Sequence, residues 1–212
     1  MTHAKIGIIG AGKMGTAFAK RLAASGHDVS ITARHEAHAQ QAASSTGGKV
    51  RAVRPSEIAR DADLLILATP YASAADALRA AGDVSGKTVV DITNPVTPDM
   101  SGLAVGYTSS AAEEIQKSAP AARVVKAFNT IFAHVLSDAP SNGSKAQVLY
   151  AGDDAKAKED VRKLIESAGF EAVDAGPLAN ARQLEPLGLL NIFLGYVAGR
   201  GTGIAPAFVS VA

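Results

Sequence analysis

The stretch KIGIIGAGKMGTAFAKRLAASGHDVSITARHEA, residues 5–37, decides the fold of this chain. A short apolar run at 5–9 leads into Gly10, Gly12 and Gly15, and a helix-like segment and a second apolar run follow. This is the G-x-G-x-x-G pattern of a strand, turn and helix that hold a dinucleotide. The first glycine permits the tight turn, the second lets the backbone approach a pyrophosphate, and the third lets helix and strand pack closely. The stretch therefore predicts nucleotide binding.

Strand-like and helix-like runs alternate along the rest of the chain. Runs of aliphatic and β-branched residues predict strands at 5–9, 29–32, 64–68, 88–91, 124–127, 147–151 and 171–174. Stretches rich in Ala, Leu and Lys predict helices at 14–25, 36–45, 73–80, 111–119 and 155–167, and an apolar helix at 178–197. This alternation predicts an α/β fold, a Rossmann-type doubly wound and mostly parallel sheet. The turn-forming residues of 137–144 predict a boundary between a nucleotide-binding domain, 1–136, and a smaller C-terminal α/β portion, 145–212.

Composition excludes several classes of protein. The net charge of +1 leaves no basic field that would gather nucleic acid or an anionic membrane. The chain has no cysteine, so it has no disulfides, thiol nucleophiles or thiolate metal ligands. The apolar run before Gly10 is too short for a membrane span or a signal sequence. We expect a cytoplasmic protein with no nucleic-acid and no membrane partner.

The end of the second predicted strand indicates which dinucleotide is bound. It reads Thr32-Ala33-Arg34-His35, where an NAD site usually places Asp or Glu and an NADP site places Arg. The guanidinium of Arg34 can bind a phosphate and stack on adenine, and the side chains of Thr32 and His35 can add hydrogen bonds. Glu36 leaves NAD open, although a carboxylate there also favours a helix N-terminus. The sequence predicts NADP(H).

Three more turns follow predicted strands: Ala68-Thr69-Pro70, Thr93-Asn94-Pro95 and Asn129-Thr130. Ligands bind at the carboxyl edge of open α/β sheets, where such turns meet. The amide of Asn94 can bond a nicotinamide carboxamide or a ribose hydroxyl. Thr-Pro and Asn-Pro are also ordinary turn formers, so each turn alone has a purely structural alternative. Together they favour a site at this edge.

Several segments resemble the NADPH:coenzyme F420 oxidoreductase family. They are the opening, ATPYASA (68–74), DITNP (91–95), VVKAFNT (124–130) and AGDDAKAKEDVRKLIESAGFEAVDAGPLANARQLEPL (151–187). The same family fold occurs in the reductase domain of the six-transmembrane metalloreductases. The glycine pattern is shared by many reductases, whereas the block GDD…VDAGPL…AR…LE is more specific.

The resemblance implies a role for each matching residue. The loop at Ala11, Gly12, Lys13 and Met14 would hold the pyrophosphate, and Ala33, Arg34 and His38 the 2′-phosphate. The family has Lys or Arg where this chain has His38, so the phosphate contact is expected to be weaker or pH-dependent. The loops at Thr69, Pro70 and Asn94 would pass along the nicotinamide half of NADPH. The two stacked rings would lie against Asn129, Thr130, Ile131 and Ala133. At the position of Asn129, coenzyme F420 reductases can carry histidine, which leaves the acceptor open.

The chemistry implied is hydride transfer between NADP(H) and a flavin-like ring, most simply coenzyme F420. The sequence has no evident Ser-His-Asp set and no His pair at metal-ligand spacing on one helix. We therefore expect no catalytic acid and no metal, because hydride can pass directly between stacked rings. His3, His27 and His38 are expected to be solvated. His134 follows the ring-facing stretch, and its role is left open between capping and solvation.

Two alternatives remain open from the sequence. IGIIGAGKMG also resembles the start of pyrroline-5-carboxylate reductases, so a flavin, imine or keto-acid reductase is possible. A non-catalytic NADPH-sensing module is the alternative outside enzymes. The apolar stretch 184–209 predicts core or subunit interface, and we expect a homodimer contact there.

Overall fold

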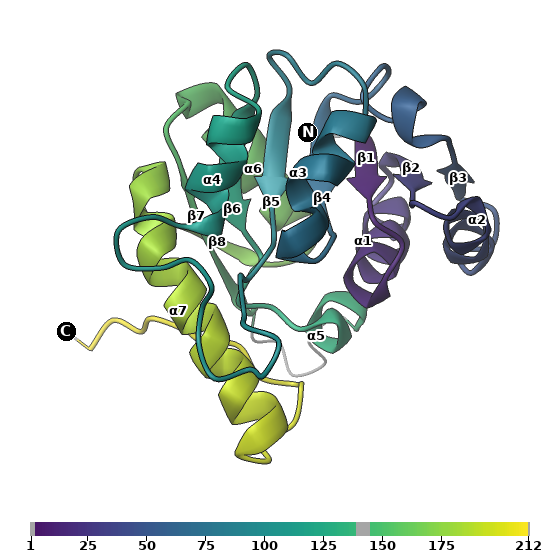
Figure 1. The fold of residues 1–212 in the computed structure, drawn as a ribbon. Coiled ribbons are helices and arrows are strands. Elements are labelled where there is room, and N and C mark those ends of the chain that lie inside the picture. The colour runs from purple at the N-terminus through teal and green to yellow at the C-terminus, as the bar shows by residue number, and fades with distance from the viewer. Residues whose placement is uncertain (1–2, 139–144, 212) are drawn as a thin grey trace.

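An eight-stranded sheet forms the centre of the computed structural model, which describes residues 3–138 and 145–211 (Figure 1). The strand order is β3-β2-β1-β4-β5-β6-β7-β8. Neighbouring strands pair in parallel except β6 and β7, which are antiparallel. The strands are β1 (Lys5–Ile9), β2 (Asp28–Thr32), β3 (Val50–Ala52), β4 (Leu64–Leu67), β5 (Thr88–Asp91), β6 (Arg123–Ala127), β7 (Gln147–Gly152) and β8 (Glu171–Asp174).

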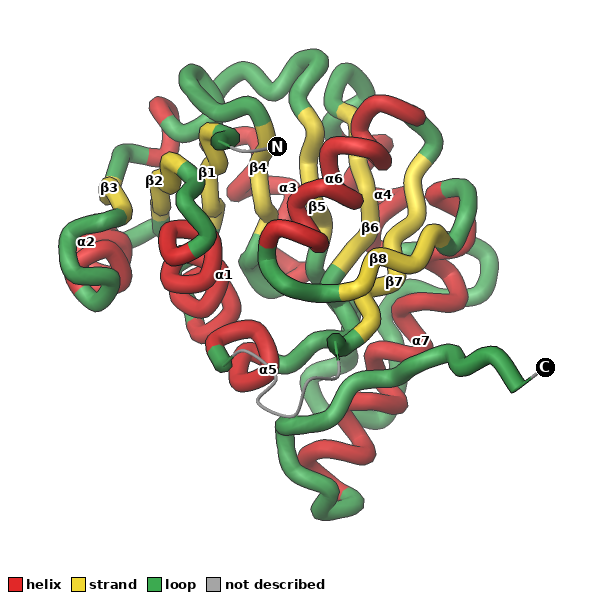
Figure 2. The backbone as a smooth tube through the Cα atoms, turned by 180° about the vertical axis from the view of Figure 1, so that it is seen from behind, coloured by secondary structure: helices red, strands yellow, loops and turns green. Residues whose placement is uncertain are grey.

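Helices cover both faces of the sheet, as the two opposite views show (Figure 1, Figure 2). The α-helices are α1 (Lys13–Ala24), α2 (Glu36–Ser44), α3 (Tyr71–Ala80), α4 (Ala111–Ser118), α5 (Ala133–Ser137), α6 (Ala155–Ser167) and α7 (Ala181–Ile192). Shorter helical turns are η1 (Pro55–Glu57), η2 (Leu178–Asn180) and the π-turn η3 (Phe193–Val197). The predicted α/β, Rossmann-type and mostly parallel fold is confirmed.

The alternation of strand side chains explains the two layers of core. In β4, Leu64 and Ile66 pack into the core beneath α1 and α6, while Leu65 and Leu67 pack into the core beneath α3 and α4. Successive residues of a strand point to opposite faces, so a fully apolar strand must be covered on both sides. A third, small cluster joins β7 to α7 through Leu149, Ala151 and Leu184.

Some elements lie outside the sequence prediction. Strand β3 and helix α5 are only three and five residues long, and two of the three residues of β3 are exposed, so neither has a readable apolar period. The predicted helix at 178–197 is divided into η2, α7 and η3. The predicted boundary loop lies mostly outside the described residues. The two-part division stays a prediction, and β7 extends the same sheet by pairing with β6.

The prediction that His27 is solvated is wrong. His27 is buried, its Nδ1 accepts from the backbone N–H of Ala4 at 3.3 Å, and its Nε2 lies 2.8 Å from the hydroxyl of Ser167. Burial lowers the pKa of His27 below its usual value. The ring of His27, in the turn after α1, contacts the residue before β1 and the last residue of α6. Because these segments are distant in the sequence, no local pattern predicts the contact.

Candidate functional site

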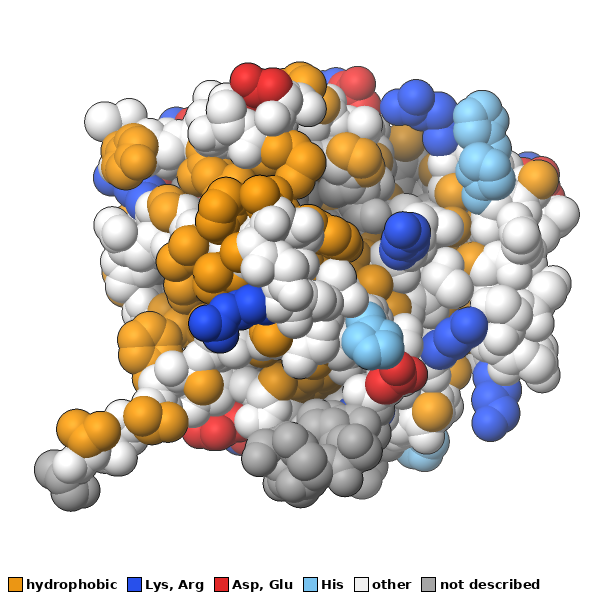
Figure 3. All heavy atoms as spheres, turned by 90° about the horizontal axis from the view of Figure 1, so that it is seen from below, with side chains coloured by type: hydrophobic (Ala, Val, Ile, Leu, Met, Phe, Trp, Pro, Cys, Tyr) orange, Lys and Arg blue, Asp and Glu red, His pale blue; other side chains and the backbone are white. Residues whose placement is uncertain are grey.

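A cavity of about 710 Å³ opens at the carboxyl ends of β1, β2 and β4; we call it the edge cavity. It is formed where the turns after these strands meet, as parallel strands require. Ten of the predicted site residues line it: Gly10, Ala11, Gly12, Ala33, Arg34, His35, His38, Ala68, Thr69 and Pro70. Figure 3 looks onto this edge of the molecule.

The three glycines of the turn have different surroundings. Gly10 has a φ of +116°, and a Cβ on it would lie 2.4 Å from the carbonyl oxygen of Ala68. A Cβ on Gly15 would lie 1.8 Å from the carbonyl oxygen of Gly10, so helix α1 packs directly against the turn after β1. A Cβ on Gly12 would meet no atom within 4 Å. Gly10 and Gly15 are therefore required by packing, and Gly12 is not.

Gly12 is the N-cap of α1 and provides no side-chain cap for the first helical N–H groups. These N–H groups and the positive end of the helix dipole face an open space beside the cavity. A pyrophosphate is the kind of anion that such a turn binds. The local geometry thus fits the role that the sequence assigns to this turn.

The rim of the edge cavity beyond β2 is basic. Arg34, His35 and His38 are all exposed, and the rings of the two histidines pack edge to face with centroids 5.5 Å apart. Glu36 lies in the first turn of α2, where its carboxylate accepts a hydrogen bond from the side chain of Gln40 at 2.9 Å. That contact and the helix dipole account for Glu36 without a ribose.

Five buried side-chain oxygens have no hydrogen-bond partner among the described residues. All five lie at the carboxyl edge, at the end of β2 or in the turns after β4, β5 and β6: Thr32 Oγ1, Thr69 Oγ1, Thr93 Oγ1, Asn129 Oδ1 and Thr130 Oγ1. An unpaired buried polar group costs about 1–3 kcal/mol, so each one needs an explanation. Two of these residues, Thr32 and Thr69, line the edge cavity, so a polar ligand bound there would lie beside their side chains. The residues present therefore fit a dinucleotide.

Asn94 and Asn129 form an amide pair at the ends of β5 and β6. Asn94 Nδ2 donates to the backbone oxygen of Asn129 at 2.7 Å. Asn129 Nδ2 donates to Asn94 Oδ1 at 3.0 Å and to the backbone oxygen of Leu184 on α7 at 2.7 Å. Backbone carbonyls can only accept, so they fix the orientation of both amides.

Helix α7 reaches this pair because Gly188 has no side chain. A Cβ on Gly188 would lie 2.4 Å from Asn94 Oδ1 and 2.8 Å from Asn129 Nδ2. A second close approach occurs in η3, directly after α7, where a Cβ on Gly195 would lie 2.6 Å from the ring of Phe132. The glycines of the apolar C-terminal helix thus let it close against the sheet edge.

A buried ion cluster, missed by the sequence interpretation, lies beneath the amide pair. Lys126 Nζ on β6 lies 2.6 Å from Asp91 Oδ2 on β5, 2.8 Å from Glu185 Oε1 on α7, and 2.7 Å from the carbonyl oxygen of Thr93. The three charged side chains are almost fully buried. Burial raises the pKa of Glu185 above its usual value, and the ammonium of Lys126 opposes that rise. The available signal was a single lysine inside the apolar run VVKAF.

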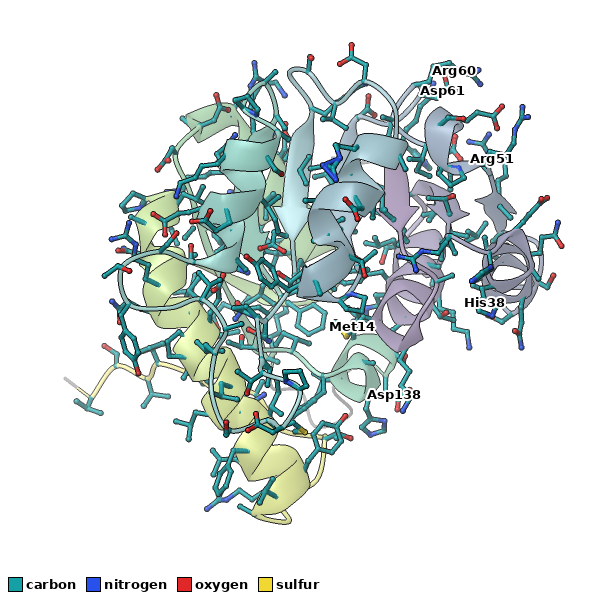
Figure 4. All side chains as sticks on the ribbon, in the orientation of Figure 1. Met14, His38, Arg51, Arg60, Asp61 and Asp138 are labelled. Atoms are coloured by element: carbon teal, nitrogen blue, oxygen red, sulfur yellow. The ribbon has the colours of Figure 1, made fainter. Side chains whose placement is uncertain are left out.

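The remaining predicted site residues lie near the edge cavity or near the Asn94–Asn129 amide pair. Lys13 and Ala133 line a groove between α1, α2 and α5 that shares Gly12 with the edge cavity. Met14 packs on the core, and Figure 4 shows it near the middle of the sheet edge, while His38 lies on α2. Pro95, Thr130 and Ile131 are buried. His134 is exposed, with Nδ1 3.2 Å from Asp138 Oδ2. None of these except His38 lines the edge cavity.

The family-specific block has structural roles near α7. Asp153 accepts from the N–H of Leu178, Asp154 caps α6, and Asp174 accepts from the N–H of Gly176. Arg182 and Glu113 form an ion pair between α7 and α4 at 2.6 Å. These contacts fix the turns that lead into α7.

No helix within 3–138 and 145–211 is long and apolar enough to cross a membrane. Within the same ranges, no group of three or more acidic or histidine side chains could hold a metal ion.

A family model and a solved structure both relate this chain to coenzyme F420-dependent NADP reductases. The family model of NADP oxidoreductase, coenzyme F420-dependent, matches residues 5–95. A solved structure from Arthrobacter sp. FB24, to which an F420-dependent NADP reductase activity is ascribed, is 32% identical, with 94% of this chain and 96% of that chain covered and a TM-score of 0.84. A hypothetical protein from Sinorhizobium meliloti is 33% identical, with 85% and 88% covered and a TM-score of 0.75.

A curated relative extends well beyond this chain. The rat metalloreductase STEAP3 is 31% identical over 188 residues, which are 88% of this chain but 37% of that protein. The chain thus spans little more than a third of this relative. Because the Arthrobacter protein is matched over nearly its whole length, the resemblance predicted from the sequence is confirmed. The chain belongs to the coenzyme F420-dependent family of NADP oxidoreductases.

Proposed function

We propose that this chain transfers hydride between NADP(H) and a flavin-like ring, with coenzyme F420 as the first candidate. The observation that carries the proposal is the row of five unpaired buried oxygens along the edge that begins at the glycine turn. The ribose hydroxyls and the carboxamide of a dinucleotide would provide partners for such oxygens. Membership of an NADP oxidoreductase family supports the choice of nucleotide.

In this proposal each part of NADP(H) has its own residues. The pyrophosphate lies on the turn formed by Gly10, Ala11, Gly12, Lys13 and Met14, and the 2′-phosphate on Ala33, Arg34, His35 and His38. The nicotinamide half follows Ala68, Thr69, Pro70, Asn94 and Pro95, and the acceptor ring lies near Asn129, Thr130, Ile131 and Ala133. When bound, the reduced nicotinamide supplies the hydride. The protein contributes the distance, the orientation and the exclusion of water.

The acceptor is tested by following NADPH oxidation with coenzyme F420, FMN, FAD, an imine and a keto acid in parallel. We expect coenzyme F420 to be reduced fastest, because the family's description names it. Reduction of only the imine or the keto acid would contradict the ring acceptor. Tight NADPH binding with no turnover on any acceptor would favour the non-catalytic sensing module.

Arg34→Ala is expected to weaken NADPH binding by about 1.5–3 kcal/mol, the range for a hydrogen bond to a charged group. The reason is that the exposed guanidinium on the cavity rim would lose its contact with the 2′-phosphate. NADH binding is expected to change little, because NADH has no such phosphate. Isothermal titration of both nucleotides measures the two losses.

Arg51→Ala is the matched control. Arg51 is an exposed arginine that pairs with Asp28 at 3.1 Å and lines a different cavity with Lys5 and Asp61 (Figure 4). It should leave both affinities unchanged. Equal losses of NADPH and NADH in Arg34→Ala would remove the assigned role.

The same proposal includes a homodimer. Leu190, Phe193, Tyr196 and Val197 at the end of α7 and in η3 are half exposed or more. Hydrophobic side chains also gather on the α7 side of the face seen in Figure 3. Apolar surface of this kind favours association, and symmetric dimers are the commonest assemblies. Light scattering coupled to size exclusion should give twice the chain mass of 21.5 kDa, and Phe193→Glu should give the monomer.

A further inference from the structure

Helix α7 is tied to the carboxyl ends of β5 and β6 by polar contacts as well as by packing. Glu185 contacts Lys126 at 2.8 Å, Leu184 accepts from Asn129 at 2.7 Å, and Asn191 Nδ2 donates to the carbonyl oxygen of Thr130 at 3.0 Å. Two of the four residues after β6 that the resemblance places at the rings, Asn129 and Thr130, are thus bonded to this helix. The position of α7 therefore determines the shape of this end of the site.

Glu185 is the contact that fixes the rotation of α7. Besides Lys126, its carboxylate accepts from the N–H of Ala111 at 2.9 Å and of Ala112 at 3.2 Å, at the start of α4. A shift of α7 by one residue would turn this side chain by about 100° and leave a carboxylate and an ammonium buried without partners. The ion cluster therefore selects one register of the helix.

The register of α7 has a direct effect on Asn129. Both N–H groups of the Asn129 amide are used, one by the carbonyl oxygen of Leu184 and one by Asn94 Oδ1. Its own Oδ1 is buried and has no partner among the described residues. Leu184 directly precedes Glu185 in the chain. The carboxylate that fixes the helix thus also fixes the carbonyl that orients this amide.

We propose that Glu185 and Lys126 are positioning residues, which hold α7 so that Asn129 keeps a free carbonyl oxygen for an N–H of the nicotinamide carboxamide. This inference rests on the proposed binding of NADP(H) along the edge. It assigns Asn129 a defined task, that of a hydrogen-bond acceptor. It also gives a buried charge cluster a reason other than stability, since well-packed apolar residues would stabilise a core about as well.

The experiment compares two ligands in the same variants by isothermal titration. NADP⁺ carries the nicotinamide carboxamide, whereas 2′,5′-ADP carries only the adenosine half with its 2′-phosphate. Glu185→Ala is chosen over a lysine variant because Lys126 keeps Asp91 as its partner. We expect Glu185→Ala to lower NADP⁺ affinity about tenfold and 2′,5′-ADP affinity less than twofold. Asn129→Ala should do the same, and the double variant should lose no more than either single one.

Arg182→Met is the matched control, because Arg182 also ties α7 to α4 but does not contact Lys126. It should leave the ratio of the two affinities unchanged even if the melting temperature falls. An unchanged ratio in Glu185→Ala, an equal loss of both ligands, or a hundredfold loss in the double variant would each overturn the inference. If Glu185→Ala fails to fold, Glu185→Gln has the same shape, and a loss of threefold or more of NADP⁺ alone is expected.

The outcome for the wild-type protein separates this inference from the proposed function. Wild-type protein that binds 2′,5′-ADP as tightly as NADP⁺ would overturn the role of Asn129 but leave the adenosine site in place. Wild-type protein that binds neither ligand would overturn the proposed function, and this inference with it.

Discussion

Gly12→Val is expected to abolish NADPH binding, by at least a hundredfold, while the protein keeps its fold. The backbone at Gly12 has a φ of −77° and a ψ of −169°, an extended conformation that valine adopts readily. The new side chain would meet no protein atom near its Cβ and would enter the space that the pyrophosphate needs. Titration calorimetry measures the binding, and a thermal melt measures the fold.

Gly15→Ala gives the opposite result and serves as the comparison. Its Cβ would lie 1.8 Å from the carbonyl oxygen of Gly10, so α1 must move away from the strand and the melting temperature must fall. Gly12→Val that binds NADPH within threefold of the wild-type protein would show that the turn is only structural.

Lys126→Met is expected to be the most destabilising single change, at about 3–5 kcal/mol. It would leave Asp91 and Glu185 buried without the ammonium that lies 2.6 Å and 2.8 Å from them. Folded domains are stable by only about 5–15 kcal/mol, so the loss is a large share of the total. For a chain of this size the melting temperature should fall by roughly 6–20 °C. Urea denaturation followed by circular dichroism gives the free energy of unfolding.

Lys117→Met is the control for the loss of a lysine and its ion pair. Lys117 contacts Glu114 at 2.8 Å, but both side chains are exposed to water. Such pairs contribute about 0–1 kcal/mol, so this variant should be close to wild type. Similar losses in the two variants would mean that the burial of Lys126 is not what makes its charge important.

The regular part of the fold could be predicted because it depends on local pattern. Apolar runs mark β1, β4 and β5 within one residue at each end, and the glycine spacing marks the first turn. Strand β3 could not be found this way, since three residues with two of them exposed carry no period. His27 was misjudged for a related reason. Its partners are Ala4, the residue before β1, and Ser167, the last residue of α6, and only the folded chain brings them together.

In the candidate site, too, features that depend on local sequence could be predicted, and features that depend on long-range packing could not. The turns after β1, β2 and β4 could be placed at one edge because parallel strands end together, and the edge cavity contains all three. The contacts of α7 with Lys126 and Asn129 could not be predicted, because they depend on how a distant helix packs against the sheet. Lys126 looked like an ordinary strand residue, and Glu185 like part of a family pattern without a stated role.

The most direct test of hydride transfer uses NADPH deuterated on the transferring face, with coenzyme F420 or another 5-deazaflavin as acceptor. An ordinary flavin is unsuitable, because its N5 proton exchanges with water and the label is lost. If hydride passes directly between the two rings, mass spectrometry should find one deuterium in the reduced deazaflavin and none released to solvent. Deazaflavin that stays oxidised or unlabelled, while an imine or a keto acid takes up the deuterium, would contradict the proposed function.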